Sequence, residues 1–291
     1  VNVAFSRIIN NYPFDGTAND VQTFLDGLTG FEKYIFDQFP KYKNFARFIT
    51  SDSTFISVDD FAGTSLPTLS RDKTGQSILD PGTSSISFEM KYFAPDETTN
   101  PSVILQKLSG SNGFSVVASG SAGSADERIQ VYFSSASIGL SASFDVPKGQ
   151  FNHIVAQFNR LAGQQRLEIF VDSLLSATSS AVSEFGNIDF AVSPLTIGSG
   201  SAHASPGFVT FTPVNTLTGA LDELRIFHAT RSIDDQKALS TQNIYPSDAL
   251  KLYYKFNEVT GTYGGNTIVL DGSGNSLHGS YENSTVAAAS R

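Results

Sequence analysis

Apolar and polar side chains alternate at every step along Ile86-Ser87-Phe88-Glu89-Met90-Lys91-Tyr92. Successive side chains of a β-strand point to opposite faces, so this pattern predicts a strand with one face in a core and the other in water. Similar short runs follow, separated by turns rich in glycine, serine and asparagine. Many short strands of this kind predict an all-β sandwich or barrel. We expect further strands at residues 102–108, 113–119, 128–134, 138–144, 151–158, 166–172, 194–198, 219–228 and 251–257.

Residues 17–39 follow a different period. Apolar side chains recur there at spacings of three and four, which places them on one stripe of an α-helix. Gly27 and Gly30 interrupt this helix, and each costs about 1 kcal/mol of helix stability. We therefore predict an N-terminal helical arm that packs against the sandwich or against a neighbouring subunit. The residues expected to make this assembly contact are Val21, Phe24, Leu28, Phe31 and Ile35.

The charge balance excludes several classes of partner. The chain carries 19 Lys and Arg against 28 Asp and Glu, a net charge of −9, and no cluster of basic residues. Nucleic acid is therefore not expected as a partner, because phosphate binding needs a basic surface. No apolar run approaches the ~18 residues of a membrane span, so we expect a soluble polypeptide. Without cysteine the fold must depend on its core, on oligomerisation or on bound metal.

A short helix is expected directly after the strand at 219–228. Ser232 can cap the first turn of residues 232–239, and Asp235 occupies the position where a capping box normally has Glu or Gln. No other segment between residues 54 and 230 has a helical pattern.

Three sets of motifs carry family information. They are Phe151-Asn152-His153-Ile154-Val155-Ala156 with Arg166-Leu167-Glu168-Ile169-Phe170-Val171-Asp172-Ser173, then Leu217-Thr218-Gly219-Ala220-Leu221-Asp222-Glu223-Leu224-Arg225-Ile226-Phe227, and finally Leu252-Tyr253-Tyr254-Lys255-Phe256-Asn257-Glu258 with Asp271-Gly272-Ser273-Gly274-Asn275-Ser276-Leu277-His278-Gly279.

Together these motifs resemble the laminin G-like branch of the concanavalin A-like lectin/glucanase superfamily. The resemblance implies a two-sheet antiparallel jelly-roll sandwich, to which the helical arm is added. We expect the arm at residues 1–50, the sandwich at 51–245 and a C-terminal strand segment at 246–291.

The sequence departs from the family pattern in two residues and in the order of its motifs. Phe151 replaces a tryptophan and Ser173 replaces a turn glycine. The last motif normally opens such a domain, whereas here it closes the chain. Residues 246–291 therefore complete the first sandwich, begin a second one, or add a strand to a neighbouring subunit.

Two places are candidates for calcium. The resemblance implies that an acid at the position of Asp222 holds a structural Ca²⁺; alternatively, Asp222 forms hydrogen bonds while Glu223 pairs with Arg225 or solvent. Asp271, Ser273 and Asn275 offer oxygens at alternate positions of a glycine-rich turn, which is suitable chemistry for calcium but lacks the spacing of an EF-hand. A plain tight turn is the alternative reading.

We find no catalytic motif. Glycosidases of the superfamily carry E-x-D-x-x-E on one strand, where residues two apart share a face, and this sequence has no such string. The four histidines have no metal-binding spacing, and we expect His153 to lie in the sandwich or at its edge. Tyr92, Tyr132 and Phe133 could in principle stack on a sugar, but core positions suit them better.

The sequence therefore predicts a non-enzymatic structural or adhesive protein. One hypothesis is a virion component, such as a phage tail, baseplate or capsid-associated protein, that contacts other structural subunits or surface glycans. The alternative is a calcium-dependent carbohydrate-binding module or bacterial adhesin at a cell surface. An enzyme with an unrecognised site is a third hypothesis.

Overall fold

The computed structural model divides into two units after Phe45, and the described strands lie between Ala46 and Glu282. The predicted helical arm, with its assembly residues at 21–35, lies outside the residues that the structure describes. Those are residues 45–48, 53–59, 77–95, 101–120, 124–135, 138–190, 193–240, 242, 244–256 and 268–283.

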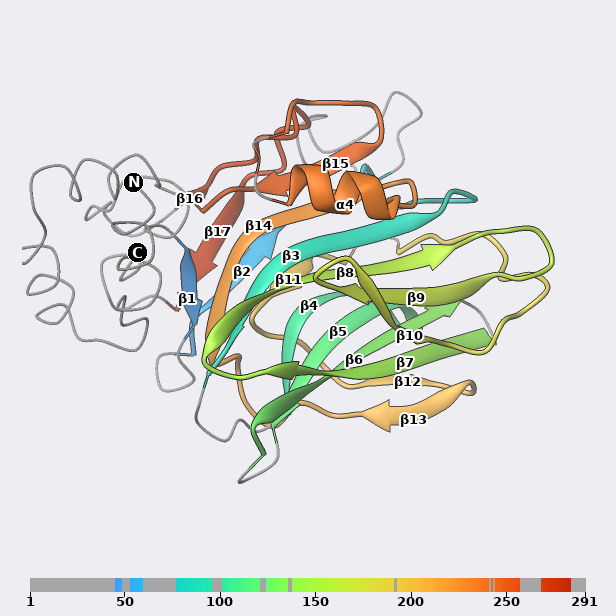
Figure 1. The fold of residues 1–291 in the computed structure, drawn as a ribbon, viewed down its shortest axis with the longest axis horizontal. Helices are drawn as coiled ribbons and strands as arrows, with labels where there is room; N and C mark the ends of the chain where they lie inside the picture. Colours follow the sequence, from blue (N-terminus) through green and yellow to red (C-terminus); the bar gives the residue numbers. More distant parts are fainter. Residues whose placement is uncertain are drawn as a thin grey trace, which may run out of the picture. The chain divides into compact units, whose positions relative to one another are not determined.

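Two antiparallel sheets form a sandwich (Figure 1), which confirms the predicted all-β class. The first, sheet A, has the strand order β1-β14-β3-β8-β9-β10, with β15 also paired to β14. Its strands are β1 (Ala46–Phe48), β3 (Ile86–Ala94), β8 (Gln150–Asn159), β9 (Arg166–Val171), β10 (Leu174–Thr178), β14 (Gly219–Phe227) and β15 (Leu250–Tyr254).

The second, sheet B, has the order β16-β17-β2-β11-β4-β5-β6-β7. Its strands are β2 (Phe55–Val58), β4 (Ser102–Ser109), β5 (Asn112–Gly120), β6 (Asp126–Ser135), β7 (Ile138–Pro147), β11 (Leu195–Ile197), β16 (Ile268–Val269) and β17 (Gly279–Glu282).

The core between the sheets follows from the alternation in the sequence. Phe88 of β3 meets Phe114 of β5 with ring centroids 4.2 Å apart, and Phe133 of β6 meets Phe158 of β8 at 4.9 Å. Each pair joins sheet A to sheet B. These rings come from alternate positions of strands that the sequence pattern predicted, so the inward residues of both sheets build one core.

Strands from both ends of the described chain enter the same two sheets. In sheet A, β1 and β15 both pair with β14. In sheet B, β17 pairs with β2, where Tyr281 lies opposite Ile56. The hydroxyl of Tyr254 donates to the carbonyl of Leu277 at 2.6 Å, which ties β15 to the segment before β17. The described part of residues 246–291 therefore belongs to the same sandwich as the strands before it.

The predicted short helix is confirmed as α4 (Ile233–Leu239). The Ser232 side chain accepts a hydrogen bond from the Asp235 amide at 3.1 Å, as the capping pattern predicted. Among the described residues, no helix has the length and apolar character to cross a membrane.

A separate hairpin of β12 (His203–Ser205) and β13 (Phe208–Phe211) covers part of the outer face of sheet B. Phe208 and Phe211 pack on Tyr132 of β6, at centroid distances of 4.8 and 5.9 Å. Gly139 of β7 allows this close approach, because a Cβ there would lie 2.9 Å from the Phe208 ring. The buried His203 ring contacts the hydroxyls of Ser115 and Ser134.

The turn between β9 and β10 supplies a test of the local geometry. Asp172 and Ser173 both have positive φ, 49° and 65°, as in a two-residue hairpin turn that glycine suits best. We expect Ser173→Gly to raise the free energy of unfolding by about 1 kcal/mol, because the left-handed conformation is strained for serine. Urea unfolding measures this change. Ser141→Gly, on an exposed position inside β7, is the control and should lower the same quantity.

Candidate functional site

A polar hollow of about 340 Å³ opens over one end of β5, β6 and β7. The β12–β13 hairpin contacts the same strands near Ser134 and Gly139, whereas the hollow lies beside Ser119 and Arg128. Its lining residues are Ser119, Gly120, Ser124, Asp126, Arg128 and Asp145.

The alternation of β6 places the charged residues of the hollow on the outer face. Ile129, Val131 and Phe133 point into the core, so Asp126 and Arg128 point outward. In the register of sheet B, Arg128 lies opposite Ser119 of β5 on one side and Asp145 of β7 on the other. Three strands thus contribute one side chain each to a single polar row.

Arg128 and Asp145 form a two-pronged ion pair. The Arg128 Nε donates to Asp145 Oδ1 at 2.5 Å and Nη2 donates to Oδ2 at 3.0 Å. The side chains are 49% and 46% exposed. Such an exposed pair adds only about 0–1 kcal/mol to stability. It does hold a guanidinium and a carboxylate in fixed positions at the surface, where both can hydrogen-bond a polyhydroxylated ligand.

The aromatic residues considered for sugar stacking are buried. Tyr92, Tyr132 and Phe133 are at most 7% exposed. Among the tyrosines and phenylalanines that the structure describes, Tyr245 alone has a largely exposed side chain, with an exposed fraction of 88%. It lies in the loop between α4 and β15, and no pattern in the sequence distinguished it from the buried tyrosines.

The structure brings Asp271, Ser273 and Asn275 together in one turn. Asp271 Oδ1 accepts from the amides of Tyr253 and Ser273, at 3.0 and 2.9 Å. Its Oδ2 accepts from the Ser273 hydroxyl at 2.7 Å and from the Leu277 amide at 3.1 Å. Four protein donors therefore use the carboxylate that a calcium ion would need. This donor set does not fit a calcium site and organises the turn instead.

The charged groups that act on Asp222 do not belong to that turn. Asp222 is buried on β14, and the charges that act on it come from Glu223, Lys91 and Arg225. Burial, followed by the neighbouring charge of Glu223, raises the pKa of Asp222 to about 8. Among the described residues, no group of three or more acidic or histidine side chains is arranged for a metal ion.

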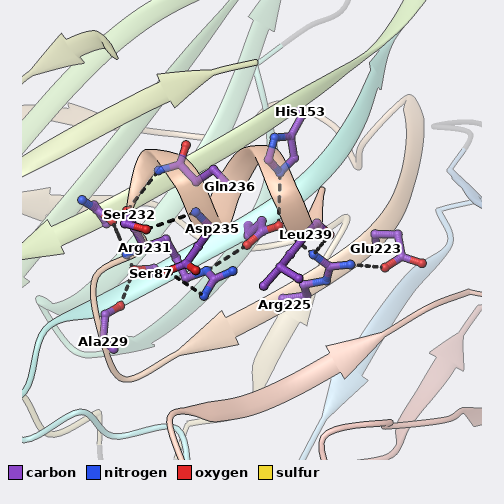
Figure 2. A network of polar contacts seen from close by, with 12 residues as sticks. Ser87, His153, Glu223, Arg225, Ala229, Arg231, Ser232, Asp235, Gln236 and Leu239 are labelled. Carbon is purple, nitrogen blue, oxygen red and sulfur yellow. Dashed lines mark hydrogen bonds and ion pairs between the residues drawn. The ribbon is translucent and has the colours of Figure 1, made fainter. Parts of the chain in front are cut away.

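A buried polar network fastens α4 to the outer face of sheet A (Figure 2). Arg225 of β14 is 1% exposed and donates to Glu89 Oε1 of β3 at 2.7 Å and to Glu223 Oε2 at 2.6 Å. It also donates to the carbonyls of Leu239 at 2.9 Å and Gln242 at 2.8 Å, at and beyond the end of the helix. One guanidinium therefore joins two strands and α4.

Glu89 is the acceptor at the centre of this network. Burial alone would raise its pKa, but the hydrogen bond to His153 and the charges of Arg225 and Arg231 hold the pKa below its ordinary value. His153 of β8 lies 3.2 Å from Glu89 Oε1, on the outer face of sheet A and not in the core between the sheets. Glu89 and Glu223 thus both form ion pairs with Arg225.

The sequence did not indicate the residues of the polar hollow as a candidate site. Asp126, Arg128 and Asp145 are ordinary surface residue types, and they become neighbours only through the register of three strands. The alternating pattern of β6 places residues 126, 128 and 130 on the outward face, and that was the feature of the sequence that could have indicated them.

Comparison with known proteins identifies the fold. A family model described as the concanavalin A-like lectin/glucanases superfamily matches residues 70–235, which confirms the resemblance seen in the sequence. A comparison with curated proteins gives no match.

Solved structures include similar folds at low identity. A Bacteroides ovatus ATCC 8483 protein, provisionally named as carbohydrate binding, is 16% identical with a TM-score of 0.52, covering 82% of this chain and 57% of its own. This chain thus spans little more than half of that protein. Two weaker similarities are the sialyllactose-bound CBM40 of the Ruminococcus gnavus IT-sialidase (11% identity, TM-score 0.44, 68% and 96% coverage) and a heptameric SAP-like pentraxin from Limulus polyphemus (12%, 0.44, 68% and 80%).

The buried carboxyl of Asp222 leads to a pH-dependent prediction. Its folded pKa of about 8 lies above its usual 3.8, so the folded protein binds more protons than the unfolded chain between these values. Stability must therefore fall as pH rises through this window. We expect Asp222→Asn to raise the free energy of unfolding at about pH 8 by about 1–3 kcal/mol and to change it little at about pH 5, where the wild-type carboxyl is protonated. Urea unfolding at the two pH values measures the difference, and an equal effect at both would contradict the assignment.

Proposed function

Because this chain belongs to the concanavalin A-like lectin/glucanases superfamily, we propose that it is a non-catalytic domain that binds carbohydrate in the polar hollow over β5, β6 and β7. The observation that carries this proposal is the exposed ion pair of Arg128 and Asp145 in a hollow otherwise lined by serine, glycine and aspartate. Arg128 Nε and Nη2 donate to Asp145 and Nη1 donates to Ser143, so neighbouring sugar hydroxyls would bind the remaining guanidinium hydrogens and the remaining lone pairs of Asp145. A volume of about 340 Å³ suits a ligand of one or two sugar rings.

The acidic residues of the hollow support binding over hydrolysis. A glycosidase needs one carboxyl that holds a proton and a second that acts as base or nucleophile. Both oxygens of Asp145 accept hydrogen bonds from Arg128. The buried Glu89 and the partly exposed Glu223 are both in ion pairs with Arg225. Neither lines the hollow.

We further propose that the domain serves attachment in a structural or adhesive protein, on a virion or at a cell surface. The support is the apolar stripe of residues 17–39, whose glycines make an isolated helix unstable and favour contact with another subunit. A phage tail, baseplate or capsid-associated protein would combine such an assembly element with a glycan-binding sandwich.

The alternative is a calcium-dependent carbohydrate-binding module or adhesin. Asp222 is the observation in its favour, since a buried carboxyl beside Glu223 would be relieved by a nearby cation. The turn at Asp271 supports it less, because its carboxylate is already saturated by protein donors.

Substitution in the hollow tests the proposed sugar site. We expect Arg128→Ala to weaken binding of the best ligand found on a glycan array by about 10- to 100-fold, since a hydrogen bond from a charged group contributes about 1.5–3 kcal/mol. Thermal stability should stay nearly unchanged, because the ion pair is exposed. Isothermal titration and thermal unfolding measure the two quantities.

Arg166→Ala is the matched control, since Arg166 forms a partly exposed ion pair with Glu168 on sheet A, away from the hollow. Equal binding by wild type and Arg128→Ala would exclude the hollow. Binding that survives Arg128→Ala but disappears with a chelator would favour the calcium-dependent alternative.

The assembly role predicts a change in solution mass. Because β1 begins at Ala46 and pairs with β14, deletion of residues 1–45 removes none of the described strands. We expect the full chain to be oligomeric and the shortened chain monomeric, as measured by light scattering. A monomer in both forms would argue for a free-standing binding module and against an assembly role of the stripe.

A further inference from the structure

A buried histidine ring anchors the β12–β13 hairpin on the outer face of sheet B. His203 of β12 is completely buried, and its ring lies between hydroxyl groups of two neighbouring strands. Its Nδ1 atom is 2.9 Å from Ser115 Oγ of β5, and its Nε2 atom is 2.7 Å from Ser134 Oγ of β6. Phe208 of β13 packs edge-on against the same ring, with the centroids 5.0 Å apart. The polar contact of the hairpin with β5 and β6 therefore passes through one imidazole.

The neighbouring groups decide which ring nitrogen carries the proton. Gln106 Oε1 of β4 accepts from the Ser201 amide at 2.7 Å, so the other end of this side-chain amide is the donor. Gln106 Nε2 donates to the Ser115 hydroxyl at 2.9 Å. Ser115 Oγ therefore gives its own hydrogen to His203 Nδ1, which must be an acceptor. The proton of the neutral ring is then on Nε2, which donates to Ser134 Oγ.

This series of hydrogen bonds does not accommodate a second proton on the ring. Ser134 Oγ donates its hydrogen to the Ser111 carbonyl, so the hydroxyls on both sides of His203 have their hydrogens assigned. A proton on Nδ1 would meet the hydrogen that Ser115 donates, and that hydrogen bond would be lost. The imidazolium would also be a cation buried away from water, which is costly unless an opposite charge lies nearby.

The groups around the ring do not supply an opposite charge. Burial lowers the pKa of His203 from its ordinary 6.5 to about 4, and no charged group contributes to this change. Gln106, Ser115 and Phe208, from β4, β5 and β13, are uncharged. Tyr132 of β6 packs on the ring at a centroid distance of 6.1 Å, and burial raises its pKa, so it stays neutral in acid. Residues 191–221 contain no other titratable side chain than His203.

We propose that the β12–β13 hairpin is an acid-released flap, which leaves sheet B when His203 gains a proton on Nδ1. The two strands pair with each other in a separate sheet, so their release breaks no strand pairing of sheet B. Beneath the hairpin, Val103, Val117 and Tyr132 form a small apolar cluster with the hairpin residues Phe208 and Phe211. Release exposes this cluster beside the polar hollow. The mechanism does not depend on what the hollow binds.

Proton linkage gives the direction and the size of the effect. The docked ring has a pKa of about 4, below the 6.5 of an exposed histidine, so the docked hairpin binds fewer protons than the released hairpin between these values. The contribution of His203 to docking is therefore complete above about pH 6.5 and is lost as the pH falls. The equilibrium constant for release should rise about 10-fold for each pH unit between about pH 6.5 and 4.

Hydrogen–deuterium exchange of the full chain tests the proposal. Exchange is followed by mass spectrometry from about pH 7 to 4 and is corrected for the intrinsic pH dependence of amide exchange. We expect peptides from residues 203–211 to lose protection by about 10-fold per pH unit below 6.5, while peptides from β5 and β6 keep theirs. Constant protection of the hairpin, or equal loss of protection in all strands, would overturn the proposal.

Two histidine variants assign the effect to the ring. His203→Gln keeps a hydrogen-bonding side chain without a titratable group, so protection of the hairpin should no longer depend on pH in this range. His228→Gln is the matched control, because His228 is also buried with a pKa lowered to about 4 but contacts the Leu79 carbonyl. It should leave the pH dependence of the hairpin unchanged. Wild-type pH dependence in His203→Gln, or its loss in His228→Gln, would contradict the assignment.

Nitrogen NMR of the wild-type ring covers the case in which His203→Gln prevents docking at every pH. We expect His203 to carry its proton on Nε2 at about pH 7, and the signal of the charged ring to appear together with the loss of hairpin protection. A charged ring in a hairpin that stays protected would show that protonation does not release the flap.

Discussion

Phenylalanine rings packed between the two sheets are the contact on which the rest of this structure depends. The chain has no cysteine, so no disulfide supports the sandwich. Phe88 and Phe114 meet across the sheets, as do Phe133 and Phe158, and Phe185 closes on Phe158 at 4.7 Å. Each fully buried ring contributes about 1.5–3 kcal/mol through loss of exposed apolar surface. Because alternate residues of each strand are committed to this core, the intervening residues are free to form polar surfaces.

The outer faces of the two sheets differ: one carries a buried polar network and the other an open polar hollow. On sheet A, Arg225 and Glu89 are buried under α4, where removal of charges from water costs free energy that the mutual attraction only partly offsets. What the network supplies is specificity: Arg225 reaches two carboxylates and two carbonyls only when α4 has one orientation. On sheet B, the β12–β13 hairpin covers one end of the face and leaves the other end open as the polar hollow.

The sequence was sufficient for elements whose pattern is local. The alternation predicted β3 and the long strands of sheet B, and the capping residues predicted α4. Six short strands were not predicted, because two to four residues rarely establish a period of two: β1, β2, β12, β13, β16 and β17. The three-residue strand β11 was predicted, within residues 194–198. β10 was missed for another reason, since its side chains are mostly exposed and show no apolar alternation.

Contacts between distant segments could not be predicted in the same way. Nothing local in the sequence links Ile56 to Tyr281, or Asp80 to Asp189, because these neighbours arise from strand order and loop position. The polar hollow belongs to this class: Arg128 and Asp145 are recognisable as a pair only once the register of β6 and β7 is fixed. The Asp271 turn was predicted as a turn or a calcium site because its residues are adjacent, and its hydrogen bonds favour the turn.

The strand order also joins the described strands that precede Asp80 to the rest of the sandwich. β1 is paired with β14, and β2 lies between β17 and β11. The two described strands before Asp80 are therefore hydrogen-bonded to strands that follow it. Phe48 and Ile56 are also buried in the common core.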